Sequence, residues 1–105
     1  MAEHKVVFLV PALDDLEEIV LYLARGSAEA SLKIHDAIVA QSAELATFPK
    51  LGRLVPDKKL GERGFRILTI SPYILLYRMV DETIFIYRVL HGARNYPVLF
   101  KTLSG

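Results

Sequence analysis

The segment TIFIYRVLHGARNY, residues 83–96, decides how the rest of the chain is interpreted. Strict alternation divides residues 83–91 between two faces, with Ile84, Ile86, Arg88 and Leu90 on one and Phe85, Tyr87, Val89 and His91 on the other. Because both faces are largely apolar, we predict a central strand that is covered on both sides. Gly92 then permits a turn that a side chain would resist. Arg94, Asn95 and Tyr96 follow at the strand's exit, where scaffolds often present functional groups.

Two further strands are predicted directly before this segment, at residues 65–70 and 73–80. The pairs Ser71-Pro72 and Asp81-Glu82 separate the three strands, and such short separations predict an antiparallel meander. A two-residue loop at Asp81-Glu82 places Arg78 opposite Phe85, Leu76 opposite Tyr87, Ile74 opposite Val89 and Leu75 opposite Arg88. Arg78 and Arg88 are then expected to point to opposite faces, where each must pair or reach water.

The N-terminal half predicts one strand and a helical hairpin. The β-branched run KVVFLV, residues 5–10, is read as a strand. A helix with the apolar stripe Leu13, Leu16, Val20 and Leu23 follows as far as Gly26. Ser27 is a predicted cap for a second helix, residues 28–48, which Pro49 ends. Residues 49–64, rich in Gly, Pro and basic residues, are expected to form a loop.

These elements predict an α+β fold in a single domain, residues 1–105. A small, mostly antiparallel sheet combines the N-terminal strand with the C-terminal three-strand meander, and the helical hairpin packs on one of its faces. Since two helices cover only one face of a sheet, the opposite apolar face is expected to receive a partner.

Composition narrows the class of protein. Of the 105 residues 52% are apolar, which excludes a disordered chain, and the net charge is +1. The basic residues gather in the second half, so the partner is expected to be anionic, either an acidic protein or nucleic acid, unless this charge only solvates the surface. There is no cysteine, and the three histidines lack metal-ligand spacing, so neither a metal nor a cofactor is expected. No apolar run is long enough to span a membrane and no secretory signal is evident, so a cytoplasmic protein is expected.

Several stretches together resemble one protein family. The order of elements, PKLGR (49–53), YILLYRMVD (73–81) and above all RVLHGARNY (88–96) resemble the RelE/ParE superfamily of bacterial type II toxins, closer to the ParE branch. The resemblance covers nearly the whole chain. It implies a growth-inhibiting toxin of the kind found in plasmid stabilization. It also implies a hetero-oligomer with a cognate antitoxin, in which only the antitoxin binds operator DNA.

The two branches of the superfamily act differently. RelE-like toxins cut mRNA on the ribosome, whereas ParE-like toxins inhibit DNA gyrase. Laid on this chain, the strand cations of a RelE-like nuclease fall on Ile74, Leu68 and Arg66, and its arginine after the last strand falls on Arg94. Its C-terminal tyrosine falls on Phe100, which has no hydroxyl to donate.

The resemblance therefore favours gyrase inhibition by protein binding, with an mRNA interferase or an inactive toxin that acts only in autoregulation as the alternatives. The residues expected to bind the target are Arg94, Asn95, Tyr96, Phe100 and Lys101. Those expected to bind the antitoxin are Arg78, Phe85 and Tyr87. If the chain is a nuclease, its catalytic candidates are Arg66, His91, Arg94 and Tyr96. His91 has an alternative structural role at the strand's end, and Tyr96 an alternative packing role beside Pro97.

Overall fold

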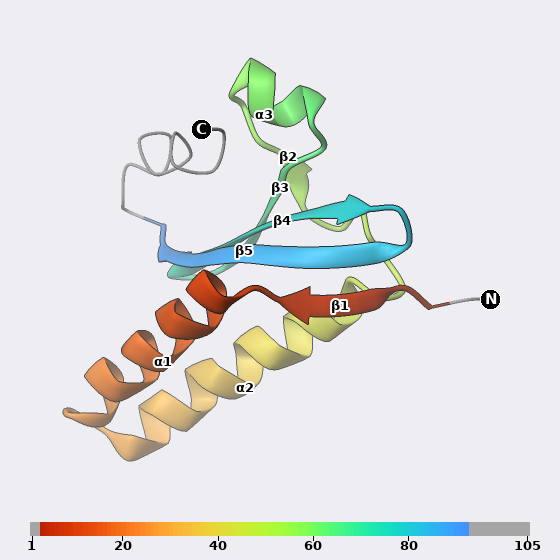
Figure 1. Ribbon diagram of the computed structural model, residues 1–105. Helices are drawn as coiled ribbons and strands as arrows, with labels where there is room; N and C mark the ends of the chain where they lie inside the picture. The colour runs from red at the N-terminus through yellow and green to blue at the C-terminus, as the bar shows by residue number, and fades with distance from the viewer. Residues whose placement is uncertain (1–2, 93–105) are drawn as a thin grey trace.

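The computed structural model describes residues 3–92, which form one five-stranded mixed sheet and three helices (Figure 1). The elements are β1 (Lys5–Phe8), α1 (Val10–Ala24), α2 (Ala28–Glu44), β2 (Arg53–Leu54), α3 (Lys58–Glu62), β3 (Arg66–Ile70), β4 (Tyr73–Val80) and β5 (Thr83–His91). The strand order is β1-β5-β4-β3-β2, with β1 parallel to β5 and the other pairs antiparallel. The predicted α+β fold and its meander are confirmed.

Two serine side chains stabilise the helical hairpin, one as the N-cap of α2 and one through a hydrogen bond between the two helices. The Ser27 side chain accepts from the Ala30 N–H at 3.1 Å and so satisfies a donor at the start of α2, as predicted. Ser31 is buried, and its hydroxyl donates to the Val20 carbonyl at 2.8 Å, which ties α2 to α1. Pro11 lies in the first turn of α1, where its missing N–H has no partner to lose.

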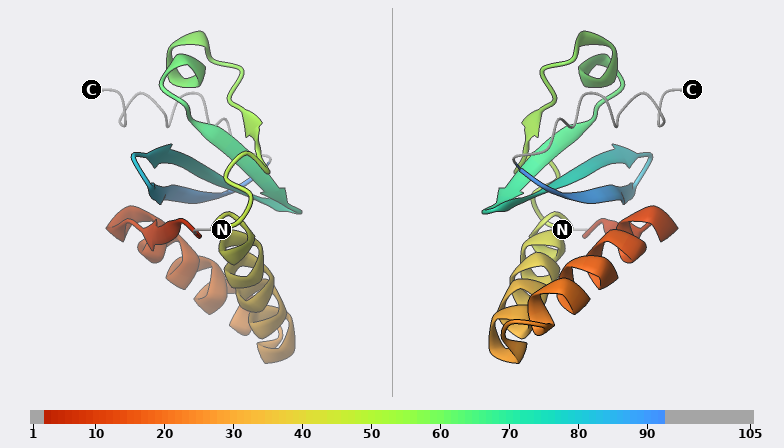
Figure 2. Two further views of the ribbon diagram at one scale, coloured as in Figure 1. Left: turned by 90° about the vertical axis from the view of Figure 1, so that its right-hand side faces the viewer. Right: turned by 90° about the vertical axis from the view of Figure 1, so that its left-hand side faces the viewer.

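The hairpin covers one face of the sheet, which we call the helix face (Figure 2). Apolar side chains of α1, α2 and every strand except β1 and β2 form a continuous core there, with Val6 and Phe8 of β1 packed against it. The fully or nearly buried members of this core are Ala12, Leu16, Ile38, Leu45, Leu68, Ile70, Leu75, Tyr77, Ile84, Ile86 and Val89.

The opposite face, which we call the open face, is covered at one end by α3 (Figures 1 and 2). This corrects the expectation that residues 49–64 form only a loop and that this face lacks any cover. The Asp57 side chain caps α3 by accepting from the Leu60 N–H at 3.0 Å, and Leu60 is buried. A second apolar core results, made of Val55, Leu60, Phe65, Ile67, Ile74, Leu76 and Leu90, with Tyr87 packed against it.

A β-bulge in β5 changes the register that strict alternation predicted. Arg78 lies opposite Phe85 as expected, but Tyr87 has no partner because it is the extra residue of the bulge. Beyond it, Leu76 pairs with Arg88, Leu75 with Val89 and Ile74 with Leu90, where we had expected Tyr87, Arg88 and Val89. The shift exchanges the faces, so that Val89 enters the helix-face core and Leu90 the open-face core.

Some predicted boundaries and stripes also differ. β1 ends at Phe8 rather than Val10, and α2 ends at Glu44, before the predicted limit of Phe48. Leu13 of the predicted stripe is 48% exposed, so it does not belong to the core side of α1, and Phe48, which lies beyond the end of α2, is 56% exposed. Within residues 3–92, no helix is long and apolar enough to cross a membrane.

Candidate functional site

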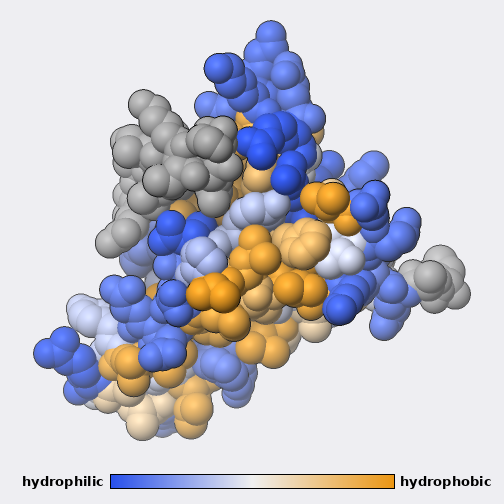
Figure 3. Space-filling model, in the orientation of Figure 1, coloured by the Kyte–Doolittle hydropathy of each residue, from blue (hydrophilic) through white to orange (hydrophobic). Residues whose placement is uncertain are grey.

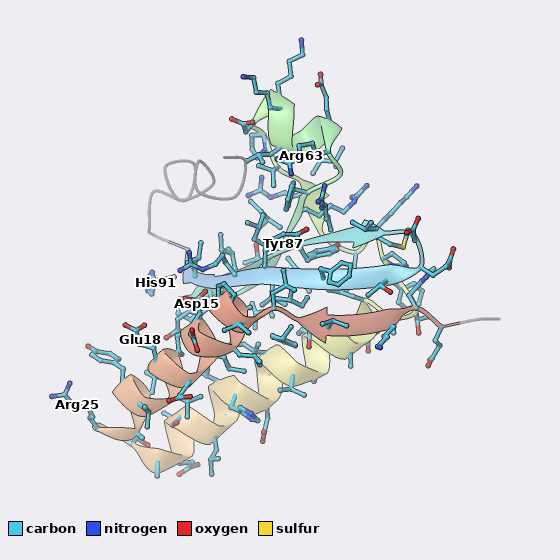
Figure 4. All side chains as sticks on the ribbon, viewed as in Figure 1. Asp15, Glu18, Arg25, Arg63, Tyr87 and His91 are labelled. Atoms are coloured by element: carbon cyan, nitrogen blue, oxygen red, sulfur yellow. The ribbon has the colours of Figure 1, made fainter. Side chains whose placement is uncertain are left out.

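Three residues expected to bind an antitoxin lie together on the open face. Arg78 of β4 is directly opposite Phe85 of β5, so the two side chains share a face. The Arg78 Nε donates to the Tyr87 hydroxyl at 3.0 Å. All three side chains are partly exposed. Figure 4 shows Tyr87 on the side of β5 that faces α3.

Two residues that the sequence reasoning did not single out complete this cluster. The Phe65 ring is fully buried and meets the Tyr87 ring edge-on, with 4.9 Å between centroids. The Arg78 guanidinium lies 4.7 Å from the Phe65 centroid, and that of Arg63 lies 5.3 Å from it. The signal was present, because the predicted β3–β4 hairpin already places position 65 opposite position 78. We call Arg63, Phe65, Arg78 and Tyr87 the arginine–aromatic cluster.

Arg88 of β5 pairs with Asp15 of α1. Its Nε and one terminal nitrogen donate to the two carboxylate oxygens at 2.7 and 2.9 Å. The Val89 N–H also donates to this carboxylate, at 3.0 Å. The hydrogen bond to Asp15 raises the pKa of Arg88 against the opposing effect of burial. Arg88 thus fastens α1 to β5. The bulge places Arg88 opposite Leu76, an open-face residue two positions from Arg78 on β4, so the prediction that Arg78 and Arg88 point to opposite faces is not confirmed.

Arg66, a nuclease candidate, holds a turn of the backbone. Its Nη1 donates to the Gly52 carbonyl at 2.6 Å. The Tyr77 hydroxyl accepts from the Gly52 N–H at 2.8 Å and donates to the Pro49 carbonyl at 2.9 Å. The PKLGR turn is thus bound to β3 and β4 by two side chains.

His91, the second nuclease candidate, lies at the other end of the sheet. It pairs with Tyr73, which pairs with Ile70, whereas Arg66 begins β3 four residues earlier, or roughly 13 Å along the strand. The His91 ring meets the Tyr73 ring edge-on at 5.6 Å and borders a small hollow with Asp15, Glu18 and Arg88 (Figure 4). The structure does not bring Arg66 and His91 together. Within residues 3–92, no group of His, Asp or Glu side chains is arranged so that it could bind a metal ion.

The remaining candidates lie outside the residues that the structure describes. They are Arg94, Asn95, Tyr96, Phe100 and Lys101. Their predicted roles in binding a target, and those of Arg94 and Tyr96 in catalysis, stay predictions.

Comparison with known proteins places the chain in a family. Residues 6–96 match the family model described as the ParE toxin of the type II toxin–antitoxin system parDE. The chain belongs to the ParE toxin family. The match begins at the second residue of β1 and runs past the end of β5, so it includes nearly all of the described sheet and the arginine–aromatic cluster.

Solved structures share the fold of this ParE-family chain. One is the chromosomal ParDE toxin–antitoxin system from P. aeruginosa, with 24% identity over 85% of this chain and 96% of that one, and a TM-score of 0.69. Another is the toxin–antitoxin complex RelBE2 from Mycobacterium tuberculosis, with 25% identity over 85% of this chain and 98% of that one, and a TM-score of 0.65. No curated protein sequence gives a match.

Two positions at which the resemblance predicts cations in a RelE-like nuclease are aliphatic in this chain. The resemblance places strand cations of the nuclease at positions 74 and 68. Here Ile74 is 6% exposed in the open-face core, and Leu68 is 8% exposed in the helix-face core. Both are aliphatic and buried, so neither supplies charge to a bound phosphate.

Proposed function

We propose that this toxin inhibits DNA gyrase by binding it as a protein, and that an antitoxin neutralises it. The match of residues 6–96 to the ParE toxin family carries the proposal. Gyrase inhibition is the activity that the resemblance to ParE-like toxins implies. A protein-binding mode of action needs a surface with a few anchoring side chains and no catalytic constellation.

The positions of the nuclease candidates in the structure favour gyrase inhibition over mRNA cleavage. Cleavage by a 2′-hydroxyl needs a proton acceptor, a proton donor and cations that gather round one phosphate. Arg66 is engaged with the Gly52 carbonyl, and His91 lies at the far end of the sheet from it. Ile74 and Leu68 offer no charge.

Two separate surfaces carry the proposed contacts. The antitoxin covers the open face, where Arg78, Phe85 and Tyr87 are partly exposed beside an apolar core. The target is bound by Arg94, Asn95, Tyr96, Phe100 and Lys101, which follow the last strand in the sequence.

Supercoiling by purified gyrase tests the proposal. Wild-type toxin is expected to inhibit supercoiling and to accumulate cleavage complexes, and added antitoxin is expected to reverse both effects. Arg94→Ala and Tyr96→Ala should each weaken inhibition about tenfold or more, since interface anchors of these types typically contribute around 2 kcal/mol or more. Arg25→Ala, at the tip of the helical hairpin (Figure 4), is the matched control and should inhibit like wild type.

Mapping of mRNA ends after induction in cells separates the alternatives. Supercoiling that is unchanged at a large excess of toxin contradicts gyrase inhibition. Cuts in the ribosomal A site that disappear in Arg94→Ala would then identify an mRNA interferase. A chain that changes neither gyrase activity nor mRNA would be a toxin retained for autoregulation.

A further inference from the structure

The arginine–aromatic cluster places two guanidinium groups against one buried ring. Arg78 and Arg63 lie 4.7 and 5.3 Å from the Phe65 centroid, and Arg78 is also 5.6 Å from that of Tyr87. An aromatic face attracts a cation and fixes the plane of a guanidinium. The Arg78 Nη1 donates a long hydrogen bond of 3.4 Å to the Arg63 carbonyl, and the Arg78 Nε donates to the Tyr87 hydroxyl. These contacts orient the two arginines without neutralising them.

No carboxylate side chain of this chain neutralises the pair. Within residues 3–92 the ion pairs join His4 to Glu82, His35 to Asp36 and Arg88 to Asp15, and none involves Arg63 or Arg78. The sequence after Glu82 contains no Asp or Glu. These two oriented cations, which lie beside an apolar surface, therefore have no side-chain counter-ion in this chain and can receive a carboxylate from a partner.

We propose that Arg63 and Arg78 form a receptor for a carboxylate side chain on the antitoxin segment that covers the open face. The inference rests on the proposed antitoxin contact and adds the chemistry of that segment, which is acidic at one position and apolar around it. A carboxylate accepts two parallel hydrogen bonds from a guanidinium fork, and this geometry suits a single Asp or Glu.

The surroundings favour a carboxylate on a protein over a phosphate of nucleic acid. Beside Arg78 on the open face lie Phe85 and then Val7 of β1, both half-buried and apolar. A nucleic-acid strand needs a track of cations along its phosphates, and here such a track would end on this apolar strip. An amphipathic protein segment matches both the cation pair and the strip.

The test measures binding between the purified toxin and the antitoxin encoded beside it, by calorimetry at two salt concentrations. Arg63→Ala and Arg78→Gln should each weaken binding between about tenfold and a hundredfold and reduce its salt dependence. Arg25→Ala removes the same charge at the hairpin tip and should bind like wild type. Arg63 is exposed, so Arg63→Ala keeps the test valid even if Arg78→Gln loses thermal stability.

An acid-to-alanine scan of the antitoxin then identifies the partner. One Asp or Glu should show an effect that is not additive with Arg78→Gln, because the two substitutions remove the same contact. Unchanged antitoxin affinity in both arginine variants would overturn the receptor while leaving the antitoxin role intact. So would variants that lose only the binding of a labelled single-stranded oligonucleotide. Failure of wild-type toxin to bind the antitoxin would remove the proposed antitoxin contact itself, and the receptor with it.

Discussion

At the scale of single residues, the Tyr77 hydroxyl holds the turn at residues 49–52 by two hydrogen bonds. It donates to the Pro49 carbonyl and accepts from the Gly52 N–H while its ring lies in the helix-face core. Tyr77→Phe leaves both backbone groups without this partner and should lower the free energy of unfolding by about 1–3 kcal/mol. Urea denaturation measures the change. Tyr22→Phe, at a tyrosine that is 68% exposed, is the control and should be neutral.

The same hydroxyl predicts a dependence of stability on alkaline pH. Burial raises the pKa of Tyr77 above its ordinary value of about 10, against the lowering effects of the Gly52 N–H and of Arg66. The fold favours the neutral form, so this contribution is complete below pH ~10 and is lost as the pH rises through the folded-state pKa. The stability difference between wild type and Tyr77→Phe should therefore shrink from pH 9 to pH 11. A difference that stays constant over this range would contradict the assignment.

The contact between Asp15 and Arg88 supports a further prediction about stability. Its carboxylate, 13% exposed, accepts three hydrogen bonds from Arg88 and Val89. Asp15→Ala leaves the Arg88 guanidinium, 23% exposed, without its counter-ion and should cost about 3 kcal/mol of stability. Asp14→Ala, an exposed neighbour on α1, is the matched control. A double-mutant cycle with Arg88→Ala that gave no coupling would refute the pairing.

At the scale of elements, Gly52 allows the turn after α2 to approach β3 and β4. A Cβ at position 52 would lie 2.6 Å from the Ile67 carbonyl oxygen and 2.8 Å from the Tyr77 ring. Gly52→Ala should thus destabilise the protein by about 2 kcal/mol, because backbone and a buried ring must move. Gly26→Ala, where the nearest atom is 3.8 Å away, should change stability by less than about 0.5 kcal/mol. Equal thermal midpoints for the two variants would contradict this.

At the scale of the whole molecule, the surface retains much apolar area. Figure 3 shows such an area over β1 and β5. Elsewhere a hollow of about 470 Å³ is lined by Phe48, Leu51 and Met79 among others. Among residues 3–92, the exposed large apolar residues are Val10, Leu13, Leu21, Tyr22, Leu32, Val39, Phe48, Leu51, Leu54, Met79 and Val80. Surfaces of this kind are typical of proteins that bind a partner.

We expect the isolated toxin to self-associate and to enhance the fluorescence of an apolar dye, and the antitoxin complex to do so less. Light scattering and dye titration of the two samples at equal concentration measure this. A monodisperse free toxin without dye enhancement would show that the exposed residues do not need cover.

Much of the architecture could be predicted because its signals are local. The limits of β4 and β5 agree with the structure residue for residue, since alternation and two-residue turns depend on adjacent positions. The helical hairpin was predictable for the same reason, from the helical spacing and the Ser27 cap. The choice of Arg78, Phe85 and Tyr87 as neighbours followed from the register next to the β4–β5 turn.

Local patterns by themselves thus determined the α+β class, the meander, the hairpin and one part of the candidate site. Only the tertiary structure decided the bulge at Tyr87, the cover that α3 provides, and the partners of the arginines. Asp15 and Arg88 are 73 positions apart, and no local pattern around either residue predicts that the two will pair. The contact between Phe65 and Arg78 follows from the β3–β4 register, whereas Arg63 and Tyr87 join it only through the position of α3 and the bulge in β5. Such contacts depend on how whole elements pack, because packing brings together residues whose local sequences carry no information about each other.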